Sequence, residues 1–126
     1  ERVFVFSNEA GGDELLPAGR TLVAEVTQEG IRRFDLSVSD FGLKEWPPGA
    51  LKGGCLEVNV RILRAILDGD YGAPRETVLM NAAAALLVAG RAESLREGVG
   101  LAAASIDGGA AREALLLLIA ISKGAA

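Results

Sequence analysis

Histidine is absent from the 126 residues, and cysteine occurs once, as Cys55. Without histidine the chain lacks the commonest general base and metal ligand, and neither a Ser-His-Asp nor a Cys-His nucleophile system can form within it. A single cysteine excludes an internal disulfide, so a reducing compartment, the cytoplasm, is the expected location. Any chemistry in this chain therefore rests on other side chains.

Long apolar runs and an excess of positive charge are missing as well. The longest apolar run, Ala114 to Ile121, is well short of the roughly 18 residues that span a bilayer, so no membrane segment is expected. The net charge is −4 and the sequence pI is about 4.8. Binding of nucleic acid needs a basic surface, so no nucleic-acid partner is expected.

The length of 126 residues is enough for one domain with a core of its own. Half of the residues are apolar and 24% are charged, which is ordinary for a globular domain. The chain begins at Glu1, without methionine and directly before a predicted strand. We therefore expect it to be a piece of a longer protein.

The N-terminal stretch carries the clearest chemical signal. Val3–Phe6 is a short apolar run rich in β-branched and aromatic residues, which predicts a buried, central strand. Gly11 and Gly12 then allow a sharp turn, and two carboxylates follow, Asp13 and Glu14. Open α/β sheets place ligands beyond the carboxyl ends of their strands, and Mg²⁺ is usually bound by one or two carboxylates plus substrate phosphates. The alternative is a solvated acidic turn without a ligand.

The next segment is predicted to be a β-hairpin over Thr21–Leu36, with a turn at 28–30. Leu22, Ala24 and Val26 are expected to share one face of the first strand, and Phe34 and Leu36 are expected on the inner face of the second. Residues 37–54 are expected to be irregular, because two consecutive prolines at 47 and 48 forbid regular structure. The apolar side chains expected to hold this loop against the core are Phe41, Leu43 and Trp46.

From residue 56 onward the apolar period changes to 3.6, which predicts four helices, at about 56–68, 74–90, 94–107 and 110–122. The apolar side of the first helix consists of Leu56, Val60, Leu63 and Leu67. Four small residues in the second helix, Ala82–Ala85, predict that another backbone packs closely there. The fourth helix is apolar nearly all round, so we expect it to be well buried. Strands followed by helices indicate one half of an α/β domain.

Several separate blocks occur in one order that resembles the C-terminal third of the anthranilate phosphoribosyltransferases. They are Gly-Asp-Glu at 12–14, Asp-Phe-Gly-Leu at 40–43, Lys-Gly-Gly at 52–54, Asn-Ala-Ala at 81–83, and the stretches 89–99 and 106–110. The resemblance extends from about Arg2 to Leu118. It implies that residues 1–126 are the C-terminal portion of a phosphoribosyltransferase/nucleoside-phosphorylase-like α/β domain. The N-terminal helical domain and the pyrophosphate loop of that family lie outside this sequence.

The resemblance assigns a role to one pair of residues. In that family the Asp-Glu pair after the strand binds the Mg²⁺ that accompanies phosphoribosyl pyrophosphate, and the matching residues here are Asp13 and Glu14. Other matching positions are interpreted as structural, since a buried helix asparagine usually satisfies backbone groups across a packing contact: Gly53, Gly54, Asn59 and Asn81. The chain departs from the family at Ser7-Asn8, where His-Gly is usual, and at Gly12, where an apolar residue is common.

The function that the resemblance implies is Mg²⁺-dependent transfer of the phosphoribosyl group of phosphoribosyl pyrophosphate to anthranilate, a step of tryptophan biosynthesis. The intact enzyme is expected to be a homodimer in the cytoplasm. The pyrophosphate loop and the anthranilate-binding residues of the family lie upstream of the blocks found here. The 126 residues alone are therefore expected to be inactive.

Three alternatives stay open. Residues 11–15, Gly-Gly-Asp-Glu-Leu, also resemble the signature of diguanylate cyclases, although that signature lies deep inside a larger domain. A non-catalytic homologue of the same fold that binds nucleic acid is a second alternative, and the acidic pI argues against it. The third is an isolated, inactive fragment.

Overall fold

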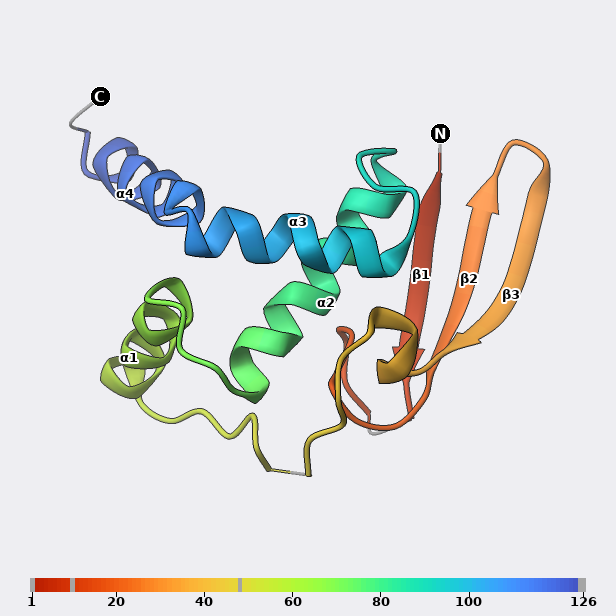
Figure 1. Cartoon of the computed structure of the whole chain (residues 1–126), viewed down its shortest axis with the longest axis horizontal. Coiled ribbons are helices and arrows are strands. Elements are labelled where there is room, and N and C mark those ends of the chain that lie inside the picture. The colour runs from red at the N-terminus through yellow and green to blue at the C-terminus, as the bar shows by residue number, and fades with distance from the viewer. Residues whose placement is uncertain (1, 10, 48, 125–126) are drawn as a thin grey trace.

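The computed structural model describes residues 2–9, 11–47 and 49–124. In chain order its elements are β1 (Val3–Asn8), β2 (Thr21–Thr27), β3 (Gly30–Leu36), the 3₁₀ helix η1 (Val38–Phe41), α1 (Leu56–Leu67), α2 (Ala73–Val88), α3 (Leu95–Asp107) and α4 (Ala110–Ser122). The predicted strand, hairpin and four helices are thus confirmed, with bounds within two residues. The sheet lies on one side of the molecule and the helices on the other (Figure 1).

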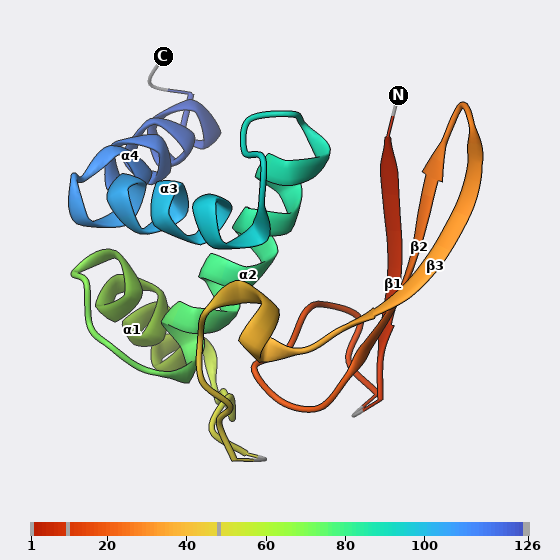
Figure 2. The same cartoon turned by 45° about the vertical axis from the view of Figure 1, so that its right-hand side comes forward.

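The sheet is antiparallel, and its strand order is β1-β2-β3. β1 therefore lies at an edge of this sheet, where it pairs with β2 through partners such as Val5 and Ala24. In both ribbon views β1 is the strand nearest to the helices (Figures 1 and 2). The prediction of a central, buried strand was wrong in this respect, because Val3 and Val5 are 50% and 59% exposed. An apolar run predicts a strand, but it does not show whether that strand has a neighbouring strand on each side.

The covered face of β2 is the one opposite to the face that Leu22, Ala24 and Val26 share. Val23 is 3% exposed, whereas Leu22 on the opposite face is 56% exposed. Val23 pairs directly with Phe34, and residues that pair directly point to the same face of a sheet. The predicted inner residues of β3 therefore share a face with Val23 and not with Leu22. The pattern of apolar residues did not indicate this face as the covered one, because it includes a charged residue, Glu25, which is 7% exposed.

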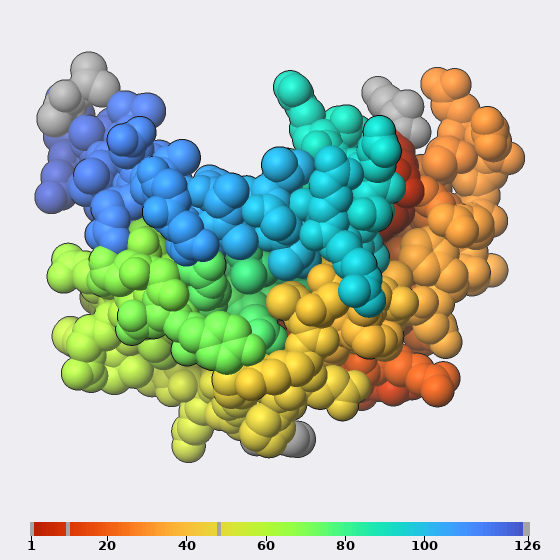
Figure 3. Space-filling model, viewed as in Figure 1, coloured from red at the N-terminus to blue at the C-terminus, as the bar shows by residue number. Residues whose placement is uncertain are grey.

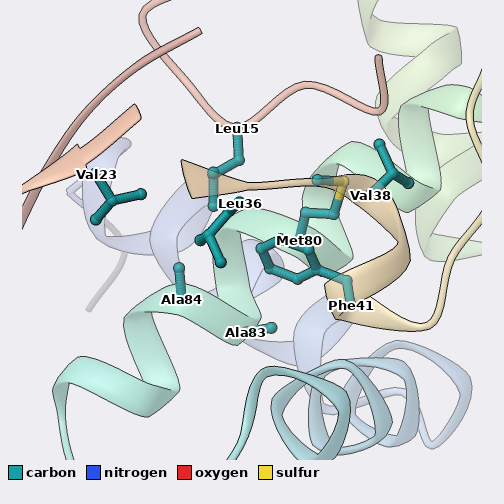
Figure 4. Packing of buried hydrophobic residues seen from close by; sticks show 8 residues of the cluster. All are labelled: Leu15, Val23, Leu36, Val38, Phe41, Met80, Ala83 and Ala84. Carbon is teal, nitrogen blue, oxygen red and sulfur yellow. The ribbon is translucent and has the colours of Figure 1, made fainter. Parts of the chain in front are cut away.

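The core gathers around α2, between the sheet and the remaining helices. Figure 4 shows how its buried side chains come from the loop after β1, from the sheet, from η1 and from α2. They are Leu15, Val23, Leu36, Val38, Phe41, Met80, Ala83 and Ala84. The predicted close approach to the alanines of α2 is confirmed: a Cβ atom added to Gly98 of α3 would lie 2.8 Å from the Cα atom of Ala83.

The prediction that the fourth helix is well buried was wrong, and the apolar side of the first helix is also largely exposed. In α4 none of the residues is buried, and Leu116, Leu117 and Leu118 are each about 60% exposed. In α1 only Ile66 is buried, while Leu56 is 73% exposed. Figure 3 shows α4 at one end of the molecule and the β2–β3 hairpin at the other. Apolar periodicity predicts that a helix face needs a partner, but the described residues do not supply one for these faces.

Candidate functional site

The acidic loop begins where β1 ends, and Asn8 fixes its first part. The side chain of Asn8 is 3% exposed, and its Nδ2 atom donates hydrogen bonds to Thr21 Oγ1 (3.0 Å) and to the carbonyl oxygen of Ala18 (3.2 Å). The backbone then turns at Gly11, whose φ of 81° lies in the left-handed region that favours glycine. The turn predicted from the glycines is confirmed, and it brings the chain back toward β2.

Asp13 and Glu14 both have exposed side chains. Among the described residues neither carboxylate is within ion-pair distance of a lysine or arginine. Glu14 accepts one long hydrogen bond, 3.5 Å from Asn81 Nδ2. The pair therefore presents oxygen donors whose negative charge no cation of the described chain offsets, which is the donor set that Mg²⁺ prefers.

The number of acidic ligands is small. Nowhere in the described ranges do three or more His, Cys, Asp or Glu side chains gather in a group able to hold a metal ion. Two carboxylates leave most of the six positions around Mg²⁺ to other oxygens, which is the usual arrangement where water and substrate phosphates complete the coordination. The two carboxylates suit an Mg²⁺ ion that binds together with a phosphorylated ligand better than one whose ligands all come from the protein.

A cavity of about 430 Å³ lies beside the acidic pair, between the loop after β1 and the loop before α1. Its lining includes both carboxylates and the apolar side chains of Leu16, Trp46 and Leu51. The two loops are tied together, because the backbone N–H of Trp46 donates to the carbonyl oxygen of Pro17 at 2.8 Å. The cavity thus has an acidic and an apolar part.

Trp46 also connects the second loop to α2. Its indole Nε1 donates a 2.7 Å hydrogen bond to Glu76 Oε2, and Glu76 is 2% exposed. Phe41 is buried in the core at 1% exposure, and Leu43 packs against the same cluster. The prediction that these residues hold the irregular loop against the body of the molecule is confirmed, and Trp46 lines the cavity in addition.

Asn81 approaches the acidic pair from α2. Its Oδ1 accepts the backbone N–H of Leu15 at 3.1 Å, and its Nδ2 donates to the carbonyl oxygen of Leu15 at 2.9 Å. The interpretation of Asn81 as a residue that satisfies backbone groups across a contact agrees with this geometry. Asn59 makes the same pair of bonds to Gly54, at 3.0 and 3.1 Å, but it is exposed rather than buried.

An arginine–carboxylate cluster that the sequence pattern did not indicate lies on the covered face of the sheet. Glu25 accepts hydrogen bonds from Arg2 Nε at 2.6 Å and from Arg32 Nε at 2.9 Å. The bond from Arg32, aided by Arg2, holds the pKa of the Glu25 carboxyl below its ordinary value of 4.5, although burial acts in the opposite direction. Arg2 also donates to the carbonyl oxygen of Leu87 in α2 at 3.2 Å. These bonds connect the sheet to α2, and none of them involves a residue of the acidic loop.

The chain matches a known protein family over most of its length. The family described as "Glycosyl transferase family, a/b domain" matches residues 1–112. The anthranilate phosphoribosyltransferase of Rhodopseudomonas palustris (strain HaA2) is 47% identical over 125 residues, which are 99% of this chain and 37% of that protein. The enzyme of the same name from Bradyrhizobium diazoefficiens is 45% identical over 124 residues, again 37% of its length. The chain therefore spans little more than a third of these relatives.

Solved structures of anthranilate phosphoribosyltransferases match the chain as well. The crystal structure of anthranilate phosphoribosyltransferase from Thermus thermophilus matches 93% of this chain with a TM-score of 0.78 and 39% identity, over 33% of its own length. The Saccharomyces cerevisiae enzyme in complex with PRPP and Mg matches 89% of this chain and 32% of its own, with a TM-score of 0.80 and 30% identity. The yeast enzyme in complex with 4-fluoroanthranilate gives a TM-score of 0.82 at 29% identity, over 91% and 34% of the two chains.

These comparisons confirm two predictions, the resemblance read from the ordered blocks and the α/β fold class that it implies. They also place residues 11–15 inside a glycosyl transferase a/b domain, which argues against the resemblance to a cyclase signature. None of the helices in the described part of the chain is long and apolar enough to cross a membrane.

Proposed function

Because this chain belongs to the glycosyl transferase family, through its a/b domain, we propose that it is the C-terminal portion of an anthranilate phosphoribosyltransferase. In the proposed reaction the amino nitrogen of anthranilate forms a bond to C1 of the ribose of phosphoribosyl pyrophosphate. The bond from that carbon to the pyrophosphate oxygen breaks, pyrophosphate leaves with the bonding electrons, and the amino nitrogen loses one proton to solvent. The observation that carries the proposal is an exposed, unneutralised Asp13–Glu14 pair on a fixed loop, in a chain 47% identical to such an enzyme.

Asp13 and Glu14 would hold Mg²⁺ in this enzyme. When bound, the ion offsets the negative charge that builds on the departing pyrophosphate. The residues of this chain would hold and orient the ligands: Asn8 bonds Thr21 at the start of β2, and Asn81 of α2 bonds the backbone of Leu15. Positioning of this kind needs neither a protein nucleophile nor a histidine base, and the composition has no histidine.

The remaining parts of the active site belong, in this proposal, to protein outside these residues. An N-terminal helical domain, the pyrophosphate loop and the residues that bind anthranilate would complete residues 1–126, a partial catalytic domain. The whole enzyme would be a homodimer in the cytoplasm. The net charge of −4 argues against the alternative of a nucleic-acid-binding homologue, because binding of nucleic acid needs a basic surface.

The test uses the full-length enzyme that carries these residues, with the turnover of anthranilate measured against Mg²⁺ concentration. Changing Asp13→Ala and Glu14→Ala together should lower the rate by roughly 100-fold or more, because charge stabilisation made in the transition state is lost. High Mg²⁺ should restore part of the rate, since the substrate still binds the ion. The melting temperature should change little, because exposed carboxylates contribute little to folding.

A matched control removes the same charge elsewhere. Glu29 in the hairpin turn and Glu113 in α4 are both exposed, and Glu29→Ala/Glu113→Ala should leave the Mg²⁺ curve at its wild-type position. Superimposable curves for the wild type and for Asp13→Ala/Glu14→Ala would end the assignment of the metal ligands. A wild-type enzyme without turnover of anthranilate would end the proposed function itself.

A further inference from the structure

Asn81 is the one side chain of α2 that bonds the backbone of the acidic loop within the described residues. We propose that Asn81 is a positioning residue of the transferase, which fixes the backbone at Leu15 so that Asp13 and Glu14 are held ready for Mg²⁺. The inference rests on the proposed function, because it takes the metal role of the acidic pair as given. It goes beyond that function in assigning a task to a residue that acts through the backbone of Leu15.

The contact is made from both ends of the side-chain amide. Oδ1 accepts from the Leu15 N–H at 3.1 Å, while Nδ2 donates to the Leu15 carbonyl oxygen at 2.9 Å. Nδ2 also donates to the carbonyl oxygen of Thr77, one turn earlier in α2, at 2.9 Å. An amide offers two N–H donors and one acceptor oxygen, so this set of partners settles its orientation. The bond to Thr77 within α2 therefore orients the side-chain amide of Asn81, and this amide holds the loop backbone at Leu15.

Leu15 is held by its side chain as well as by its backbone. The side chain is 1% exposed and belongs to the same cluster as Met80, the residue before Asn81. Asp13 and Glu14 immediately precede this anchored residue and are exposed. The boundary between core and solvent thus falls between Glu14 and Leu15, and the amide of Asn81 lies at that boundary, with Nδ2 3.5 Å from Glu14 Oε2.

Removal of the amide would leave the core contact of Leu15 intact but free its backbone N–H and carbonyl groups. The two carboxylates would then sample more orientations before the metal binds. Groups that orient metal ligands without touching the metal typically change metal affinity or activity by about 10- to 100-fold when they are mutated. A purely structural role predicts a different result: a lower melting temperature and an unchanged response to Mg²⁺.

The experiment compares Asn81→Ala with the wild type in the full-length enzyme. Amide hydrogen exchange, measured without substrate, should become about tenfold faster at Leu15, whose N–H loses its bond to Asn81 Oδ1. The Mg²⁺ concentration at half-maximal rate should rise about tenfold. The Asp13→Ala/Glu14→Ala enzyme should show no further shift when Asn81→Ala is added, because the groups that Asn81 positions are already absent.

Asn59→Ala is the matched control, since Asn59 makes the same two bonds to the backbone of Gly54. It should accelerate exchange at Gly54 and not at Leu15, and it should leave the Mg²⁺ response unchanged. If Asn81→Ala does not fold, Asn81→Ser serves instead, because its shorter side chain cannot make both bonds to Leu15 and it adds no charge beside Glu14.

The two proposals fail in different ways. Normal exchange at Leu15 in Asn81→Ala would overturn the positioning role alone, and so would a wild-type Mg²⁺ response with a lowered melting temperature. Identical Mg²⁺ curves for the wild type and for Asp13→Ala/Glu14→Ala would overturn the metal role and the positioning role together.

Discussion

At the scale of single residues, Glu25 shows how a charged side chain is accommodated on the covered face of a sheet. Its carboxylate lies between Arg2 and Arg32 at hydrogen-bond distances, and the side chain is 9% exposed. A paired carboxylate of this kind keeps its charge in the folded state, so its pKa is lower there than in the unfolded chain, where it is about 4.5. The consequence is a dependence of stability on pH.

The sign of that dependence follows from linkage. Because the pKa of Glu25 is lower in the folded state, its contribution is fully present above about pH 4.5 and is lost as the pH falls further. Glu25→Gln should therefore melt at a lower temperature than the wild type at about pH 7, and the difference should shrink toward about pH 3. Thermal unfolding followed by circular dichroism across this range is the measurement. A constant difference at every pH would show that the charge of Glu25 does not matter.

At the scale of elements, the contact between α2 and α3 depends on small residues on both helices. Gly98 is buried in α3, and a Cβ atom there would lie 2.9 Å from the carbonyl oxygen of Ala83 and 3.0 Å from its Cβ atom. Backbone atoms cannot move aside as a flexible side chain can. The two helices are therefore as close as a glycine opposite an alanine permits.

Substitution at this contact has a matched control in the same helix. Gly98→Ala should lower the free energy of unfolding by about 1–3 kcal/mol, because it forces α2 and α3 apart. Gly100→Ala should raise it by about 0.5–1 kcal/mol, because alanine favours a helix and nothing lies within 4 Å of the added Cβ atom. Denaturant titrations of the two variants give both values. Equal effects would show that helix propensity, and not packing, governs position 98.

At the scale of the whole molecule, several apolar surfaces are uncovered. The outer face of the sheet presents Val5, Leu22 and Ile31 at 59%, 56% and 63% exposure. At the far end Leu116, Leu117 and Leu118 of α4 are similarly exposed (Figure 3). Exposed apolar patches of this kind mark surfaces that contact other protein. The chain spans only 37% of the length of its relative from Rhodopseudomonas palustris, so further protein to cover them exists in such relatives.

The 126-residue polypeptide made alone should consequently self-associate and show no turnover of anthranilate. Light scattering after size exclusion measures the first property and an anthranilate assay the second. Leu22→Lys/Ile31→Lys adds charge to the outer face of the sheet, so it should reduce the association. Glu29→Lys, a charge change at an exposed polar position of the same hairpin, should reduce it less. Turnover by the isolated polypeptide would contradict the expectation that essential residues lie outside it.

The sequence by itself determined the elements and the position of the acidic pair. Periods of two and 3.6 are local properties, so the hairpin and the four helices could be predicted within a few residues. The glycines before Asp13 and Glu14 predicted a turn in the same way, and Gly11 adopts the left-handed conformation there. The four alanines of α2 indicated a close neighbour without identifying Gly98 as that neighbour.

Only the tertiary structure decided which faces are covered and which distant residues meet. Val23 rather than Leu22 is buried because the helices lie on that side of the sheet, and alternation along a strand is the same for either side. The bonds between Asn81 and Leu15 join residues 66 positions apart, so their pairing depends on where α2 crosses the loop after β1. A local sequence pattern specifies whether a segment forms a strand or a helix. Contacts between distant residues, such as Asn81 and Leu15, depend on how the segments pack against one another.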